Sequence, residues 1–413
     1  MNLFEEVTRE PWTPEMAFPM AEYERRLARV REGMAAQDLD VLLVSNTSNL
    51  GYLTGYDTTM PSGYTVLVVP ARGEVTLHCS ELEAPCMLMN GWVRRIEVFY
   101  WYAAQDTGTD LARILVEGGY AGKRVGLEMG YAETFASGAF DTRSFLRLQE
   151  HLAGSVFVDA TRLVLEVRLV KTEQELAYMR TAGTYSWAGL QAGLAACREG
   201  ATDTEVIGDA YRALKVAGSE LMSIDPMIMS GYRTGWMPHI AYRRVPLTRG
   251  DTIYFELTGT HNRYNAPAMR SAVVGQPSDG VRRLADASIA TLELLLENIR
   301  PGRTGHEVAR IAQEGLTAVP EAYFHGGFGY SIGMSFQPSW TENPVYIADG
   351  EERVLQPGMT FHLPICTWVP RQYGIGFSES VVVTESGCET LGPGQDRFLT
   401  IAPTLPEMRS QDR

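Results

Sequence analysis

The chain has 413 residues, of which 45% are hydrophobic and 21% are charged. This composition is typical of a folded globular protein, and at about 150 residues per domain the length predicts two or three domains. The 36 Lys and Arg residues against 50 Asp and Glu residues give a net charge of −14. A negative surface repels phosphate backbones and anionic lipids, so nucleic acid and membranes are disfavoured as partners.

No run of about 18 apolar residues is present, and the start of the chain lacks a basic segment followed by an apolar one. We therefore expect a cytoplasmic protein without a membrane span. The five cysteines are odd in number and form no CxxC pair. Free thiols are expected, because neither a disulfide framework nor a thiolate zinc site fits this spacing.

Residues 1–165 are predicted to form an α/β domain. Tyr23, Leu27, Val30 and Met34 recur at helical spacing and predict an amphipathic first helix. Short β-type runs then follow at 41–44, 64–69, 74–78, 95–100, 124–128 and 156–159, with helical patterns around 109–118 and 139–152. This alternation is typical of an α/β fold.

Residues 166–413 are predicted to form a second, α+β domain. Capping boxes at Thr172–Glu175 and Thr202–Glu205 each predict the start of a helix. Further helices are expected at 278–299 and 304–318, and strands near 225–231, 251–275, 358–369 and 374–384. Helices grouped beside mostly antiparallel strands give the α+β prediction.

The clearest candidate for chemistry is Glu256, which lies in the middle of an apolar strand pattern, Asp251 to Gly259. If this strand is central, burial raises the pKa of the carboxyl group. Alternation leaves another interpretation open, because Glu256 shares its side of the strand with Tyr254 and Thr258 and could face solvent.

Three further segments carry candidate residues, each with an ordinary structural interpretation beside the functional one. His239 could exchange protons near neutral pH or be a surface histidine of a loop. The glycine-rich segment 324–333 fits tight turns, and it matches no phosphate-binding motif. His362 and Glu379 lie in two strand-like runs and could be polar residues on exposed strand faces.

Taken together and in this order, these segments resemble the C-terminal "pita-bread" domain of the creatinase/aminopeptidase P/methionine aminopeptidase superfamily. Glu166 to Glu175 resembles the helical segment that opens that domain, and Leu355 to Phe361 resembles its Pro-Gly-Met turn. Two-domain members of the superfamily carry an α/β N-terminal domain of this length, so the resemblance covers nearly the whole chain.

The resemblance also places the five positions that bind two metal ions in metal-dependent members. They fall on Glu256, Pro267, Tyr330, Leu363 and Ser378. Divalent cations need several carboxylate or imidazole ligands, and four of the five are missing. We therefore expect no catalytic metal, no other cofactor and no metallopeptidase activity.

A carboxylate at the first ligand position without the others resembles the metal-free branch, creatinase and ectoine hydrolase. The motifs are most similar to those of ectoine hydrolases: Phe255–Gly259, Arg263–Tyr264, Pro267–Arg270, Gly329–Gly333, Pro338–Trp340, Glu342, Met359–His362 and Ser378–Glu379. His239 lies eleven residues before Gly250, the spacing of the catalytic histidine in creatinase. Met269 replaces the acidic residue of creatinase, which argues against creatine as the substrate.

The resemblance implies hydrolysis of a C–N bond in a small amidine or amide solute. Glu256 is then the nucleophile or a general base, His239 the acid and base, and Glu379 a second base or the group that holds the cationic substrate. The residues expected to line the substrate pocket are Tyr330, Trp340, Phe361, His362, Arg263 and Tyr264.

The resemblance further implies a homodimer with composite active sites. The segment Tyr56–Tyr64, which would close the partner's site, lacks the aromatic pattern of ectoine hydrolases, so the substrate is less well defined than the reaction class. Two alternatives stay open: a creatinase-like enzyme acting on a guanidino compound, and a solute-binding protein without turnover.

Overall fold

The computed structural model describes residues 9, 12–103, 106–130, 140–236, 238–394 and 396–406. The chain divides into two compact units, Met1–Arg168 and Leu169–Arg413. Within the described part of the chain, no helix is both long enough and apolar enough to cross a bilayer. All five cysteines are free thiols, as predicted.

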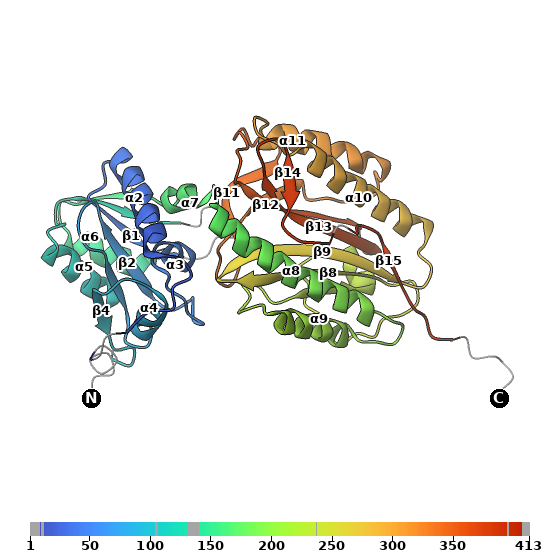
Figure 1. Ribbon diagram of the computed structural model, residues 1–413, viewed down its shortest axis with the longest axis horizontal. Helices are drawn as coiled ribbons and strands as arrows, with labels where there is room; N and C mark the ends of the chain where they lie inside the picture. Colours follow the sequence, from blue (N-terminus) through green and yellow to red (C-terminus); the bar gives the residue numbers. More distant parts are fainter. Residues whose placement is uncertain are drawn as a thin grey trace. The chain divides into compact units, whose positions relative to one another are not determined.

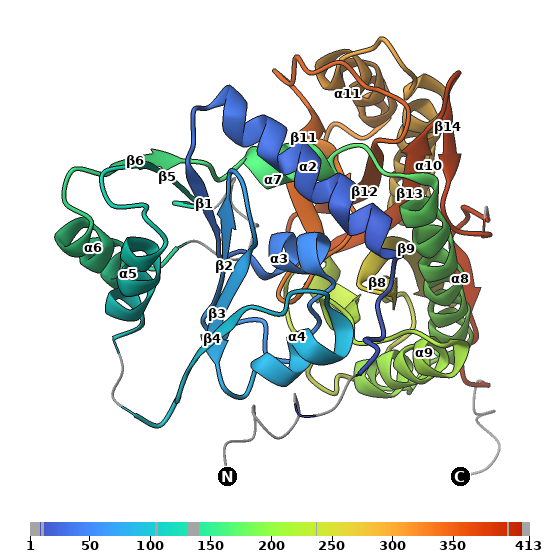
Figure 2. The ribbon, with the colours of Figure 1, turned by 60° about the vertical axis from the view of Figure 1, so that its left-hand side comes forward.

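The first unit is an α/β unit, which confirms the predicted fold class. Its strands are β1 (Val41–Val44), β2 (Thr65–Pro70), β3 (Thr76–Ser80), β4 (Ile96–Phe99), β5 (Arg124–Leu127) and β6 (Val156–Asp159). Its described helices are α2 (Met20–Ala36), α3 (Thr47–Thr54), α4 (Ala84–Asn90), α5 (Thr107–Glu117), α6 (Thr142–His151) and α7 (Leu163–Arg168). The strands form one mixed sheet in the order β4-β3-β2-β1-β5-β6, with α5 and α6 on one side and α3 and α4 on the other (Figure 2).

Amphipathic periodicity explains how these helices pack. In α2 the four apolar residues predicted from spacing, Tyr23, Leu27, Val30 and Met34, are all buried. Leu111 of α5 and Leu148 of α6 pack in one core with residues of β1, β2 and β5. The sequence does not predict the short helix α3, which begins after the polar cap Asn46. This helix is buried along its whole length, so it has no alternation of apolar and polar faces.

The second unit is an α+β unit, again as predicted. Its helices are α8 (Glu173–Ala196), α9 (Asp203–Ala217), α10 (Asp279–Asn298) and α11 (Gly305–Ala312), with the 3₁₀ helices η1 (Gly231–Gly235) and η2 (Gln313–Ala318). Its strands are β7 (Met227–Ser230), β8 (Thr252–His261), β9 (Tyr264–Val274), β10 (Gly327–Ile332), β11 (Thr341–Ala348), β12 (Thr360–Val369), β13 (Tyr373–Val383), β14 (Cys388–Thr390) and β15 (Thr400–Ala402). The main path of the sheet runs β11-β10-β12-β13-β9-β8-β7.

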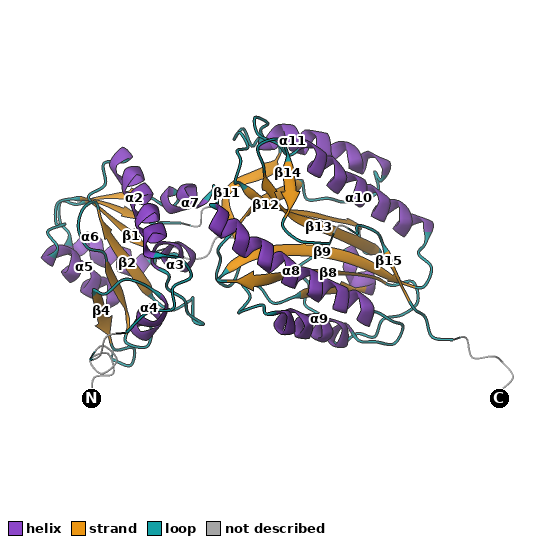
Figure 3. Ribbon diagram, viewed as in Figure 1, coloured by secondary structure: helices purple, strands orange, loops and turns teal. Residues whose placement is uncertain are grey.

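Helices cover one face of this sheet, which we call the helix face (Figures 1 and 3). Phe255 and Leu257 of β8 pack there in one core with α8 and α9 residues. Phe361 of β12 and Phe377 of β13 pack there with α10 and α11. The glycine-rich segment 324–333 contains strand β10, and Gly329 permits its close approach to β12, since a Cβ at this position would lie 2.7 Å from the Leu363 side chain.

The opposite face of the sheet carries Tyr254, Glu256 and Thr258, and we call it the Glu256 face. Successive side chains of a strand point to opposite faces, so these residues point away from Phe255 and Leu257. Both Tyr254 and Thr258 are 0% exposed. The face that points away from the helices is therefore buried as well.

Candidate active site

Glu256 lies in the middle of β8, and its side chain is only 5% exposed. Directly opposite it on the neighbouring strands are two methionines, Met227 on β7 and Met269 on β9. Burial in these surroundings raises the pKa of Glu256 to about 8. The interpretation of Glu256 as a residue that faces solvent is therefore wrong.

Next to Glu256, three side chains predicted to line the site form one hydrogen-bonded chain. The indole Nε1 of Trp340 lies 2.7 Å from Tyr330 Oη, and Tyr330 Oη lies 2.8 Å from His362 Nδ1. On the other side of the ring, His362 Nε2 lies 2.7 Å from Ser378 Oγ. The strands β10, β12 and β13 supply Tyr330, His362 and Ser378, so the sheet itself sets this geometry.

The bonds around His362 use both ring nitrogens. An indole N–H can only donate, so Tyr330 accepts from Trp340, and the same hydroxyl is bonded to Nδ1 of His362. The other nitrogen, Nε2, is bonded to the hydroxyl of Ser378. Burial lowers the pKa of His362 to about 3, so the ring is neutral near pH 7. Its Nδ1 lies 3.9 Å from Glu256 Oε1, and it supplies no positive charge there.

Glu379, predicted as a catalytic residue, lies on the helix face instead. It pairs with Leu363 across β12 and β13, one position from Ser378, so alternation directs it away from Glu256. Its Oε1 lies 2.6 Å from Arg270 Nη2 and 3.0 Å from Arg397 Nε. Because this carboxylate forms ion pairs with two guanidinium groups, we assign Glu379 a structural role and not a catalytic one.

Phe361 and Leu363 also lie on the helix face. Both are fully buried in the core that includes α10 and α11. Phe361 is thus removed from the predicted pocket, because its neighbour His362 occupies the side of the strand that faces Glu256. For the same reason the fourth ligand position, placed at Leu363 by resemblance, belongs to Pro364, which pairs with Ser378.

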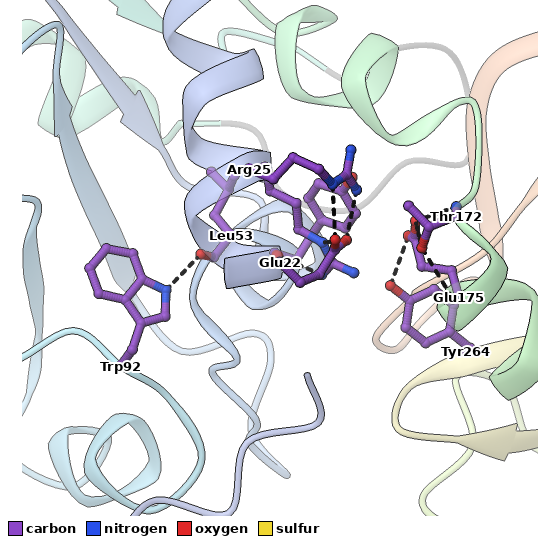
Figure 4. A network of polar contacts seen from close by, with 9 residues as sticks. Glu22, Arg25, Leu53, Trp92, Thr172, Glu175 and Tyr264 are labelled. Atoms are coloured by element: carbon purple, nitrogen blue, oxygen red, sulfur yellow. Dashed lines mark hydrogen bonds and ion pairs between the residues drawn. The ribbon is translucent and has the colours of Figure 1, made fainter. Parts of the chain in front are cut away.

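Arg263 and Tyr264 lie at the turn of the β8–β9 hairpin, away from Glu256. Tyr264 pairs with His261, five positions along the strand from the Glu256–Met269 pair, which corresponds to roughly 17 Å. Tyr264 donates a 2.9 Å hydrogen bond to Glu175, which also accepts from Thr172 in the capping box of α8 (Figure 4). A small solute at Glu256 does not reach either residue, so the predicted substrate contacts are corrected to structural ones.

His239 lies in the loop between η1 and β8, and its side chain is exposed. His325 is exposed as well, and the pKa of its imidazole is lowered by partial desolvation and by the charge of His239. The segment that carries His325 is tied to β12 by main-chain hydrogen bonds between Tyr323 and Trp368. Trp368 packs with Tyr254 and Met269 of the Glu256 face, so the segment that carries His325 lies at the end of that face.

The donor set on the Glu256 face does not fit a divalent cation. Proline has no side-chain donor at positions 267 and 364. Tyr330 and Ser378 both bond to His362, which leaves neither ring nitrogen free for a metal. Throughout the described ranges, no group of three or more His, Cys, Asp or Glu side chains is arranged to hold a metal ion. A single carboxylate is too few ligands for such an ion.

Several further residues shape the site, although the sequence does not predict this role for them. Tyr254, Met269 and Cys366 pack beside one another on the Glu256 face, and among the described residues the weakly polar Cys366 thiol is the group that interacts with the Tyr254 hydroxyl. Ser378 is named in the sequence motifs and at a lost ligand position, but its bond to His362 is not predicted there. The alternation of side chains along a strand could have indicated Tyr254, because it lies two positions before Glu256 on the same side of β8.

Comparisons with known proteins agree with this architecture. Residues 26–170 match the Creatinase/Prolidase N-terminal domain, and residues 177–385 match Metallopeptidase family M24. The chain is 30% identical over 395 residues to an ectoine hydrolase of Halomonas elongata, an alignment that covers 91% of this chain and 96% of that protein. It is 26% identical over 230 residues to a Xaa-Pro dipeptidase of Pyrococcus furiosus, covering 55% of this chain and 64% of that protein.

Among solved structures, the dipeptidase PepE from Mycobacterium ulcerans is similar to this chain, with a TM-score of 0.77 and 25% sequence identity. The similarity covers 94% of this chain and 99% of the dipeptidase chain. The two family matches and these relatives agree on the same two-domain hydrolase architecture, a creatinase-type N-terminal domain followed by a pita-bread domain. The chain therefore belongs to the M24 family.

Proposed function

We propose that this protein hydrolyses a C–N bond in a small cationic amidine without a metal, in the manner of an ectoine hydrolase. One observation carries the proposal: Glu256 is buried, and the only basic side chain within 4 Å of it in the described chain is the neutral His362. A buried carboxylate without a counter-charge favours a cationic guest, because the guest stabilises its ionised form. The similarity to the ectoine hydrolase of Halomonas elongata supports this substrate class.

In the proposed reaction, a carboxylate oxygen of Glu256 attacks the amidinium carbon of the bound solute. The ring C–N bond then breaks, its electron pair stays on the departing nitrogen, and that nitrogen takes up a proton. Water next attacks the former amidinium carbon, which is now bonded to the Glu256 oxygen. The C–O bond between this carbon and Glu256 then breaks. The products are an amide, a free amine and the regenerated carboxylate, and the covalent route replaces one difficult displacement by two easier ones.

His239 is proposed to give the proton to the departing nitrogen and then to take one from the attacking water. Such acid–base assistance contributes about 10²- to 10⁴-fold to a rate. His362 is proposed to contact the substrate with the face of a neutral, hydrogen-bonded ring, together with Tyr330 and Trp340. Aromatic walls around one carboxylate suit a small organic cation.

The experiment is an assay of the chelator-treated protein with ectoine, other cyclic amidines, guanidino compounds and Xaa-Pro dipeptides. We expect amidine hydrolysis that is unchanged by chelation, and mass spectrometry of the quenched reaction to find an adduct on Glu256. Urea release from a guanidino compound would favour a creatinase-like enzyme. Ligand-induced thermal stabilisation without product would favour a solute-binding protein.

A metal-dependent dipeptidase is the other function that the relatives suggest, since the chain is similar to a Xaa-Pro dipeptidase. Dipeptide cleavage that is abolished by chelation and restored by Mn²⁺ or Zn²⁺ would overturn the proposal. The missing donors on the Glu256 face argue against this outcome.

A further inference from the structure

Apart from a single β-bridge between Pro246 and Thr202, the loop that carries His239 has no regular secondary structure from Trp236 to Gly250 within its described residues. A side chain on such a loop is poorly positioned unless its backbone is held elsewhere, because loop residues sample many conformations. Acid–base catalysis needs the imidazole within hydrogen-bond reach of the reacting atoms. Whatever fixes this loop therefore decides how well His239 can act.

Asp203, the first residue of α9, holds this loop through its carboxylate. It is 0% exposed. Its Oδ2 accepts a 2.9 Å hydrogen bond from the backbone N–H of Arg243, and its Oδ1 accepts a 3.0 Å bond from that of Val245. Arg244 lies between these two donors with a φ of 63°, a left-handed conformation that is uncommon for a residue with a side chain. This turn directs both N–H groups to the same carboxylate, as in an anion-binding nest.

Arg233 completes the attachment. This side chain, 6% exposed, lies in η1, and its Nη1 is 3.1 Å from Asp203 Oδ2. Its Nη2 donates to the carbonyl oxygen of Ala241. The loop is thus held at Ala241, Arg243 and Val245, which are two, four and six residues after His239.

Helix capping does not account for Asp203. The N-terminus of α9 already has a complete capping box, in which Thr202 accepts from Glu205 N–H and the Glu205 side chain accepts from Thr202 N–H. The bonds that the Asp203 side chain accepts come instead from the loop and from Arg233. Its carboxylate thus serves the loop that leads into β8.

We propose that the buried Asp203–Arg233 pair is a positioning device for His239, and that it acts on catalysis only through that histidine. The inference rests on the proposed function, in which His239 transfers protons. It assigns to a pair on α9 and η1, outside the site itself, the task of holding the acid–base group over the Glu256 face.

A double-mutant cycle with ectoine as the substrate tests the proposal. We expect Asp203→Asn to lower kcat by about tenfold or more while KM changes less than about threefold, since small displacements of a catalytic group have effects of this size. In a His239→Gln background, the same substitution should change the residual kcat less than about twofold, because coupled residues are not additive. An equal loss of kcat in both backgrounds would overturn the proposal.

Two further variants separate positioning from general destabilisation. Val206→Ala, one turn further along α9 in its buried core, should lower the melting temperature and leave kcat unchanged. The double substitution Asp203→Asn/Arg233→Gln leaves no unpaired buried charge and keeps the test available if Asp203→Asn does not fold. This double variant should show the same loss of kcat and the same coupling to His239.

Hydrogen exchange gives a readout that needs no substrate. In Asp203→Asn, the backbone amides of residues 238–245 should exchange faster, while those of β8 should keep their protection. Unchanged exchange in the loop would refute the anchor itself. If His239→Gln retained full kcat, the proposed function would fail, and the exchange result would still decide whether Asp203 holds the loop.

Discussion

Two glutamates in the same sheet, Glu256 and Glu379, are almost equally buried and have opposite surroundings. Glu379, on the helix face, has guanidinium groups 2.6 Å and 3.0 Å away. Glu256, on the other face, has methionines on both neighbouring strands and a neutral histidine at 3.9 Å. Burial alone therefore does not distinguish a structural carboxylate from a reactive one; the charge of its neighbours does.

The comparison also explains how one sheet can hold both groups. A β-strand alternates its side chains, so one strand can contribute to an apolar core and to a polar site at once. In β12, His362 faces the site, whereas Phe361 and Leu363 complete the core that includes α10 and α11. The site consequently lies on the rigid part of the molecule, where strand pairing limits movement of the reacting groups.

The largest expected effect is on turnover by Glu256→Gln. Without a nucleophilic carboxylate, kcat on ectoine should fall by at least about 1,000-fold, since loss of a nucleophile removes the whole covalent route. The folded state should persist, because Gln fits the volume and adds no charge. Steady-state kinetics and circular dichroism check this, with the exposed Glu385→Gln as the matched control. Retained turnover in Glu256→Gln would show that the two carboxylates do not differ in the way proposed.

The second effect is on stability and concerns the other carboxylate. Glu379→Gln leaves the buried Arg270 without its closest charged partner, and breaking a buried ion pair in this way costs about 3–5 kcal/mol. Urea denaturation should show this loss of unfolding free energy. Under the same conditions Glu256→Gln should not destabilise the protein. Equal losses for both substitutions would mean that Glu256 also has a stabilising partner.

The third effect is the pH dependence of stability that follows from the raised pKa of Glu256. The pKa of Glu256 is about 8 in the folded protein, against roughly 4.3 in an unfolded chain. Between these values the folded state binds one more proton, so the carboxyl group makes the wild type less stable as the pH rises. Glutamine does not titrate, so the melting temperature of Glu256→Gln minus that of the wild type should increase from pH 5 to pH 8 and then level off. A flat difference would contradict the raised pKa.

Sequence patterns predicted the elements of the second unit better than they predicted its site. Capping boxes correctly placed the starts of α8 and α9, and apolar runs located β8, β9, β12 and β13. Glu256, Tyr330, Trp340 and His362 were expected at the site, and the last three are joined by hydrogen bonds beside Glu256. These are short-range features, or ones fixed by a single strand register.

The errors at Phe361 and Glu379 came from alternation within strands, whereas Arg263 and Tyr264 lie too far along the β8–β9 hairpin. Phe361 and His362 are consecutive, so they cannot both face the same site, and the same holds for Ser378 and Glu379. Which of two neighbours faces the site depends on where the helices pack, and this is a long-range property. Arg270 and Arg397 form ion pairs with Glu379 and are distant from it in the sequence. The sequence of the strand that carries Glu379 therefore does not predict them.

The smallest expected effect concerns two buried tyrosines. It tests whether the Glu256 face holds a polar group that does not stabilise the fold through a hydrogen bond. Tyr254 and Tyr264 are both 0% exposed, but only Tyr264 has a strong partner, the carboxylate of Glu175 at 2.9 Å. Tyr254→Phe should change the free energy of unfolding by less than about 0.5 kcal/mol, because only a contact with the weakly polar Cys366 thiol is lost. Tyr264→Phe should cost about 1.5–3 kcal/mol, the value for a bond to a charged group.

Urea denaturation of both variants, and of the wild type, makes the measurement. A loss in Tyr254→Phe equal to that in Tyr264→Phe would show that the Tyr254 hydroxyl is bonded in the free protein. A negligible loss of unfolding free energy in Tyr254→Phe would mean that the Tyr254 hydroxyl does not stabilise the fold. This hydroxyl lies two positions from Glu256, on the same side of β8. Such a hydroxyl is then free to bond to an acceptor atom of a solute, so the Glu256 face would differ from the helix face in having polar groups that only a ligand satisfies.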